Sequence, residues 1–81
     1  MKLIQIGEKK LYCLDKGDRK LYFSYEVPIA YVIDDVVHVT SQRFTSTTSK
    51  HKSLITNKLE DGKLNIVEDR GLFNQMVSLY F

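Results

Sequence analysis

The segment from Ile29 to Thr40 constrains the fold most, because it carries apolar side chains on both faces of one short hairpin. The pair Asp34-Asp35 predicts a hairpin turn whose type the residues leave open, because aspartate suits the left-handed conformation less well than glycine or asparagine. If the loop has two residues, Ile33 lies opposite Val36. One face then carries Ala30, Val32, Val37 and Val39, and the other carries Ile29, Tyr31, Ile33 and Val36, with His38 and Thr40. A sheet with one face in water would show a polar outer face. We therefore expect the chain's own helices on one face, and a second sheet layer or another copy of the chain on the other.

The length of the chain adds a reason to expect self-association. A domain of 81 residues has a thin core, and oligomerisation is a common remedy. We expect a homodimer or a higher homo-oligomer, and the candidate contact face comprises Ile29, Tyr31, Ile33 and Val36.

Strand patterns fill the rest of the first half. They cover residues 2–6, 10–14 and 19–25, and a later run covers residues 63–67. Asp15 and Gly17 predict a turn, and a three-residue loop there would put Cys13 on the same face as Leu21 and Phe23. Pro28 is expected at a strand start or an edge.

The apolar period becomes helical after Phe44. Leu54, Ile55 and Leu59 predict a helix over residues 48–60, with Thr47 or Thr48 as its N-cap. Residues 69–81 fit a second helix capped by Asp69, although residues 75–81 also alternate as a strand would; we favour the helix. The fold class predicted is α+β, a single domain over residues 1–81 with a small antiparallel sheet of four to six strands and one or two helices.

Charge and cysteine content bound the function. The net charge of +2 is too small to indicate a nucleic-acid-binding protein, but residues 36–59 hold no acid and four cations: Arg43, Lys50, Lys52 and Lys58. Cys13 stands alone, which excludes an internal disulfide and fits a reducing compartment; it is expected as a buried apolar residue. No signal peptide or membrane span is evident, so we expect a soluble protein of the cytoplasm.

The stretch RFTSTTSKHKS, residues 43–53, has two interpretations. Its hydroxyl groups can cap a helix, whose first backbone N–H groups need acceptors. The same helix start attracts anions, and the candidate anion or nucleic-acid site comprises Arg43, Ser49, Lys50, His51 and Lys52. The glycine-rich lead of a phosphate-binding loop is absent.

The remaining polar and aromatic residues give weaker signals. His51 is expected to be packed or hydrogen-bonded, and Asp34-Asp35 to form a turn rather than an acid pair. Tyrosines beside lysines on strands can stack nucleic-acid bases; here they are Tyr12, Tyr22, Tyr25 and Tyr31. We expect no catalytic constellation, metal or cofactor.

Two short motifs stand out, Ser24-Tyr25 followed by Ile29-Ala30, and Phe44 followed by residues 47–51. Together they resemble a family of small uncharacterised proteins of phages, archaeal viruses and plasmids. The family pattern S-Y-x-T-x-[IV]-A, then an aromatic residue with S-x-T-T-[SG]-K-H, is matched at Ser24, Tyr25, Ile29, Ala30, Phe44, Thr47, Thr48, Ser49, Lys50 and His51. Val27 and Thr45 depart from it. The resemblance implies a small α+β domain from a virus or mobile element, and no activity. It also suggests a structural latch in which Thr47 or Thr48 caps the helix while His51 bonds the sheet near Tyr25.

The sequence therefore favours a non-catalytic viral or mobile-element accessory protein that binds a host macromolecule, as a homo-oligomer and away from membranes. One alternative is nucleic-acid binding through the basic segment from Arg43 to Lys58. A second is an enzyme acting on a phosphorylated small molecule through Lys50 and His51, which requires a pocket that holds both side chains.

Overall fold

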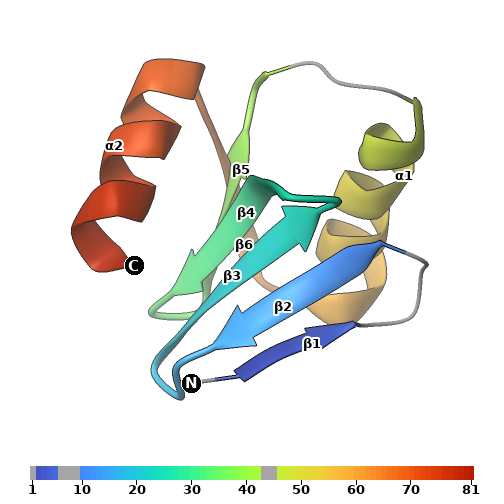
Figure 1. Cartoon of the computed structure of the whole chain (residues 1–81), viewed down its shortest axis with the longest axis horizontal. Coiled ribbons are helices and arrows are strands. Elements are labelled where there is room, and N and C mark those ends of the chain that lie inside the picture. The colour runs from blue at the N-terminus through green and yellow to red at the C-terminus, as the bar shows by residue number, and fades with distance from the viewer. Residues whose placement is uncertain (1, 6–9, 43–45) are drawn as a thin grey trace.

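The computed structural model describes residues 2–5, 10–42 and 46–81, and it forms one six-stranded sheet with a helix on each face (Figure 1). The strands are β1 Lys2–Gln5, β2 Leu11–Asp15, β3 Arg19–Ser24, β4 Val27–Ile33, β5 Val36–Thr40 and β6 Leu64–Glu68, and they lie in this order across the sheet. The helices are α1 Ser46–Leu54, which continues as the π-helical turn η1 Ile55–Leu59, and α2 Arg70–Tyr80. The predicted α+β class is confirmed.

The last ladder of the sheet is parallel, and the other four are antiparallel. The chain leaves β5, crosses one face of the sheet as α1 and η1, and returns in the direction of β5 as β6. Such a return needs a crossover of a dozen or more residues, which the helical segment supplies.

Two apolar clusters lie on opposite faces of the sheet. The cluster under α1 and η1 comprises Leu11, Cys13, Tyr22, Ile29, Ala30, Val32, Val37, Val39 and Ile55. The cluster under α2 comprises Leu21, Tyr31 and Phe73, with half-buried Leu14, Phe23, Ile33, Met76, Val77 and Phe81 packed around them. The expectation that both faces are covered therefore holds within a single chain.

The cover of the second face corrects the predicted oligomer face. Asp69 caps α2 by accepting a hydrogen bond from the Leu72 N–H at 2.9 Å, and the helix places Phe73 against Tyr31. α2 thereby buries Tyr31 inside the chain, Ile29 is buried in the cluster under α1, and no more than parts of Ile33 and Val36 reach the surface. A helix occupies the place where a second sheet or a second copy was expected.

Ile29 also lies on a different face from the one predicted. Phe23 pairs with Pro28 and Tyr22 pairs with Ala30, so Ile29 is the extra residue of a β-bulge. Pro28 has no N–H to give to a ladder, which favours such an irregularity at this point. The bulge turns Ile29 into the same cluster as Ala30, whereas strict alternation places it beside Tyr31.

The first hairpin differs from the prediction by one residue of register. The Lys16 N–H donates to the Arg19 carbonyl at 2.9 Å, and Cys13 pairs with Tyr22 rather than with Leu21. A shift of one residue moves every side chain to the opposite face. Cys13 therefore shares the α1 side with Tyr22, and the prediction that it lies beside Leu21 and Phe23 is wrong.

The crossover helix changes its pitch along its length. From residue 49 to residue 60, where burial is described, its buried side chains are His51, Ile55 and Glu60, spaced by four residues and then by five. The second spacing is that of a π turn, and the Glu60 N–H donates to the Ile55 carbonyl at 2.8 Å. The helix begins at Ser46, so Thr47 and Thr48 lie within its first turn. An N-cap residue precedes the first turn, and the prediction that Thr47 or Thr48 is the N-cap is therefore wrong.

Candidate functional site

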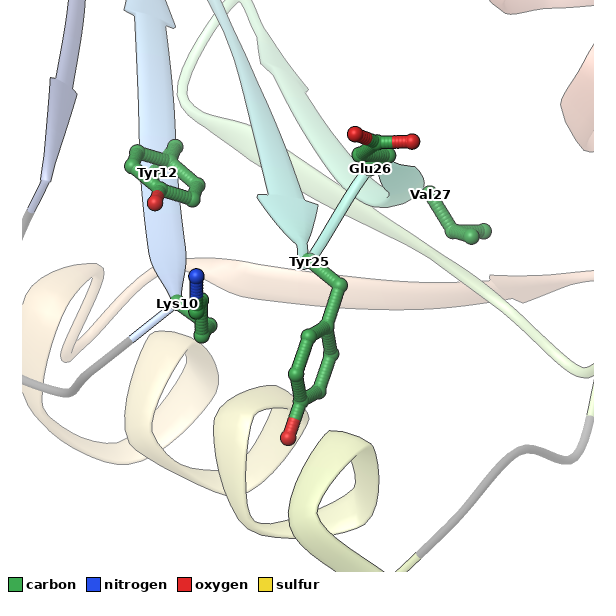
Figure 2. A pocket seen from close by; sticks show the side chains of 5 residues that line it. All are labelled: Lys10, Tyr12, Tyr25, Glu26 and Val27. Carbon is green, nitrogen blue, oxygen red and sulfur yellow. The ribbon is translucent and has the colours of Figure 1, made fainter.

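A pocket of about 390 Å³ opens where β2 begins and β3 ends (Figure 2). Its lining comprises Lys10, Tyr12, Tyr25, Glu26 and Val27. A second hollow, of about 460 Å³, adjoins it through shared walls and adds Phe23. The site thus combines three aromatic rings with one ammonium and one carboxylate group.

Two residues at the pocket have backbone conformations that side chains disfavour. Lys10 has φ +68° and Tyr25 has φ +59°, and the Tyr25 N–H donates to the Lys10 carbonyl at 2.7 Å. A left-handed conformation is uncommon for a residue other than glycine, asparagine or aspartate, and strain of this kind is concentrated at functional sites. Here the Tyr25 side chain extends from the turn toward α1 (Figure 2), and 46% of the residue stays exposed.

A buried hydrogen bond supports the pocket from below. The Ser24 hydroxyl lies 2.7 Å from His51 Nδ1, and both residues are almost fully buried. The His51 ring centre lies 6.4 Å from that of Tyr25. This contact fixes α1 to the sheet one residue before the strained turn, which is where the latch was expected to bond.

The candidate anion site does not converge on one point. His51 is turned inward to Ser24, and Lys52 donates to the carbonyl oxygens of Thr40 and Gln42 at 2.9 and 2.7 Å. Burial lowers the pKa of Lys52. Ser49 and Lys50 are exposed, and Arg43 lies outside the described residues. Neither Lys50 nor His51 lines either hollow, whereas the enzyme alternative requires both in one pocket.

The four tyrosines considered for stacking are divided between two environments. Tyr12 and Tyr25 line the pocket, whereas Tyr22 and Tyr31 are buried on opposite faces of the sheet. The buried pair donates its hydroxyl groups to carboxylates, Tyr22 to Glu60 and Tyr31 to Glu68, each at 2.7 Å. Burial, together with these hydrogen bonds, raises the pKa of both phenols well above the usual range.

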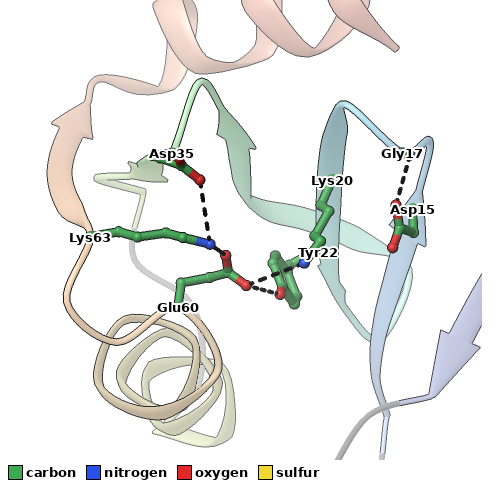
Figure 3. Close-up of polar contacts among 7 residues, drawn as sticks. All are labelled: Asp15, Gly17, Lys20, Tyr22, Asp35, Glu60 and Lys63. Carbon is green, nitrogen blue, oxygen red and sulfur yellow. Dashed lines mark hydrogen bonds and ion pairs between the residues drawn. The ribbon is translucent and has the colours of Figure 1, made fainter.

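Glu60 forms a polar cluster that the sequence did not reveal (Figure 3). Its carboxylate accepts from Tyr22 and Lys63 and lies 3.8 Å from the Lys20 ammonium group. Burial alone would raise the pKa of Glu60, but the hydrogen bonds from Lys63 and Tyr22 and the charge of Lys20 outweigh it and lower the pKa. A tyrosine on a buried strand needs a hydroxyl partner, and this requirement is the signal that could have pointed to Glu60.

Glu68 forms a second cluster under α2. It accepts from the Tyr31 hydroxyl and lies 3.1 Å from His38 Nδ1. The His38 ring stacks on that of Tyr31, with centres 4.4 Å apart. The cluster joins β4, β5 and β6, so it links the parallel strand β6 to the antiparallel strands β4 and β5.

The described part of the chain shows no group of three or more His, Cys, Asp or Glu side chains that could hold a metal ion. Within the same residues, no helix is long and apolar enough to cross a membrane. Cys13 lies in the core, as expected, and burial raises the pKa of its thiol.

The fold and the pocket define a small α+β domain with an aromatic surface hollow. The chain belongs to a family of unknown function (DUF8033), whose model matches residues 1–70. The match includes both strained residues of the pocket, the contact between Ser24 and His51, and Glu60. Searches of curated proteins and of solved structures give no match to the chain.

Proposed function

We propose that this chain is a non-catalytic accessory protein of a virus or mobile element. It acts in the host cytoplasm as a homo-oligomer and binds a host protein at the Tyr25 pocket, the hollow lined by Lys10, Tyr12, Tyr25, Glu26 and Val27. The motif resemblance supports the origin, and the make-up of the pocket supports the kind of partner.

The observation that carries the proposal is the strained, half-exposed Tyr25. A left-handed conformation costs an ordinary residue roughly 1–2 kcal/mol, and Tyr25 is 46% exposed, so packing inside the chain returns only part of that cost. Aromatic anchors dominate binding energy at protein interfaces. Lys10 and Glu26 offer one group of each charge to a polar rim, which suits a peptide backbone better than a polyphosphate chain.

The basic segment favours a nucleic-acid contact less. A protein that binds through phosphates needs several cations free to face them, yet Lys52 is committed to two carbonyl oxygens and His51 to Ser24. Among the described cations of the segment from Arg43 to Lys58, Lys50 and Lys58 are exposed, and two such groups are fewer than the several that phosphate binding needs.

The test replaces Tyr25 with asparagine, which tolerates the left-handed conformation. We expect the stability of Tyr25→Asn to stay within about 1 kcal/mol of the wild type, because relieved strain offsets the lost ring. Tagged wild-type protein and Tyr25→Asn are used to capture host proteins, and each protein captured by the wild type is purified for calorimetry. We expect Kd to weaken at least tenfold, about 1.4 kcal/mol.

Leu79→Asn is the matched control, because Leu79 is exposed on α2, outside the lining of the pocket. It should bind as the wild type does. Equal Kd values for wild type and Tyr25→Asn would refute the proposal. Labelled DNA or RNA that binds the wild type, but not Lys50→Ala, with an affinity that falls steeply with salt would favour the nucleic-acid alternative instead.

A further inference from the structure

β6 lies at an edge of the sheet and exposes apolar side chains there. Leu64 is 65% exposed, Ile66 39% and Val67 71%. Among the described strands β6 pairs with β5 alone, and none of them lies along its other side. Natural proteins shield such edges with charges, prolines, bulges or a covering element. The segment Leu64–Val67 has no charge or proline, so its edge calls for a cover.

The backbone of β6 offers hydrogen-bonding groups to that cover. The Ser41 N–H donates to the Glu68 carbonyl, so Glu68 turns its backbone groups toward β5. Successive residues of a strand turn to opposite sides. Asn65 and Val67 therefore turn their N–H and C=O groups to the open edge.

We propose that two copies of the chain join through β6, antiparallel about a two-fold axis at Ile66, to make one continuous sheet. An axis normal to the sheet keeps each helix face on its own side, so residues opposite each other must share a face. With Ile66 on the axis, Asn65 lies opposite Val67 of the partner subunit, and the two exchange the hydrogen bonds of a regular pair.

Charge complementarity favours a second copy over an unrelated strand. In this register Lys63, which also pairs with Glu60 and Asp35 of its own subunit, lies opposite the partner's Asp69, whose Oδ1 caps α2. The symmetry gives the same pair at the other end. Leu64 lies opposite the partner's Glu68, whose carboxylate is turned inward to Tyr31 and His38. The sequence from Lys63 to Asp69 is thus cationic at its start, apolar in its middle and acidic at its end, and it complements itself when reversed.

The inference rests on the homo-oligomer in the proposed function, and cysteine cross-linking tests the interface directly. In a Cys13→Ala background, Ile66→Cys should form a disulfide dimer on mild oxidation, because the central pair has Cα atoms about 4.5 Å apart. Asn65→Cys should not, since the two copies of residue 65 lie about 7–8 Å apart on a diagonal. Cross-linking of Asn65→Cys in place of Ile66→Cys would overturn the register.

The second arm measures mass by size-exclusion chromatography with light scattering. The wild type should run near twice 9.4 kDa, and Val67→Lys should run as a monomer with an unchanged circular dichroism spectrum. Leu79→Lys is the control, an equally exposed apolar residue on α2, and should stay dimeric.

The outcomes separate the two proposals. A monomeric wild type would refute both the proposed homo-oligomer and this interface. A dimer that persists in Val67→Lys, together with no cross-link at residue 66, would refute the interface alone. Binding at the Tyr25 pocket is measured independently of either result.

Discussion

Asp34 and Asp35 both have positive φ, +53° and +61°, in the two-residue turn between β4 and β5. Two positive values in succession define the type I′ turn, for which asparagine followed by glycine is the preferred pair. Aspartate tolerates this conformation less well than asparagine or glycine, so the turn is strained. No contact among the described residues requires an aspartate at either position. The ion pair from Asp35 to Lys63, at 3.9 Å and exposed, contributes little against it.

Replacing Asp34-Asp35 with Asn-Gly should therefore stabilise the protein by about 0.5–1 kcal/mol, because it removes part of the left-handed strain and glycine gives back some of that gain in the unfolded chain. Urea unfolding followed by circular dichroism measures the change as a higher midpoint with an unchanged slope. Asp18→Gly is the control, because Asp18 also lies in a hairpin turn but has no positive φ. An equal gain from both variants would show that strain at the Asp pair is not the cause.

The turn was predictable from the sequence, but the face of one neighbouring residue was not. Alternation places Ile29 with Tyr31, and it fails because Pro28 and the bulge add a residue to β4. Both faces of the hairpin are apolar, so hydrophobic pattern alone gives no sign of such a slip. The same ambiguity explains the wrong register of the first hairpin, whose loop is polar throughout.

At the level of elements, Glu60 fastens the end of the crossover helix to the sheet. It is 3% exposed and accepts from Tyr22 and Lys63. An amide at this position keeps one acceptor oxygen but turns an NH2 donor toward Lys63 or Tyr22, so one of the two hydrogen bonds is lost at a cost of about 1–3 kcal/mol. Glu60→Gln should be less stable than the wild type by that amount at pH 7, by urea unfolding.

The pH dependence follows from the lowered pKa of Glu60 in the folded state. Its ordinary value is 4.5, so the stabilisation is fully present above that pH and is lost as the pH falls through the lower, folded value. The wild type should therefore lose its advantage over Glu60→Gln as the pH falls below 4.5. Glu26→Gln, at an exposed turn, should show no such convergence.

The crossover helix shows what an element-level pattern can and cannot predict. Leu54, Ile55 and Leu59 indicated the helix, and both leucines do pack against the core. The burial of Glu60 was not predicted, because the residue is followed by a second acid and because a helix of constant pitch does not place residue 60 on the same face as Ile55. The π turn places it on that face, and no residue type between 55 and 59 indicates a π turn.

Considered as a whole, the molecule depends on α2 to close the second face of the sheet. Phe73 is fully buried against Tyr31, with ring centres 5.4 Å apart. Phe73→Ala should cost about 3–5 kcal/mol, a large part of the 5–15 kcal/mol typical of a small protein. Urea unfolding measures it, and limited proteolysis should show early cleavage within α2.

Leu79→Ala, on the exposed side of the same helix, should change stability by no more than about 0.5 kcal/mol. If Phe73→Ala unfolded no more readily than Leu79→Ala, α2 would not be holding the sheet. Far-UV circular dichroism distinguishes loss of the helix alone from loss of the whole fold.

The sequence predicted that both faces of the sheet need a covering layer, because this need depends only on which residues are apolar. The sequence could not predict whether a helix or a second copy of the chain forms that layer, since either buries the same side chains equally well.

The candidate site was likewise predicted only in part. His51 was expected against the sheet near Tyr25 and lies there, but the pocket arises from two strained backbone positions, Lys10 and Tyr25, that no residue type signals.

The wide turn at the end of the crossover leaves the chain a spare residue. A plain α-helical turn from Ile55 would reach the position of Glu60 with one residue fewer, and β6 would start from the same place. Length variants of this segment could thus keep the carboxylate beneath Tyr22 while shedding a residue from the outer surface. We therefore expect the connection between β5 and β6 to tolerate the deletion of one residue, although it packs against the core.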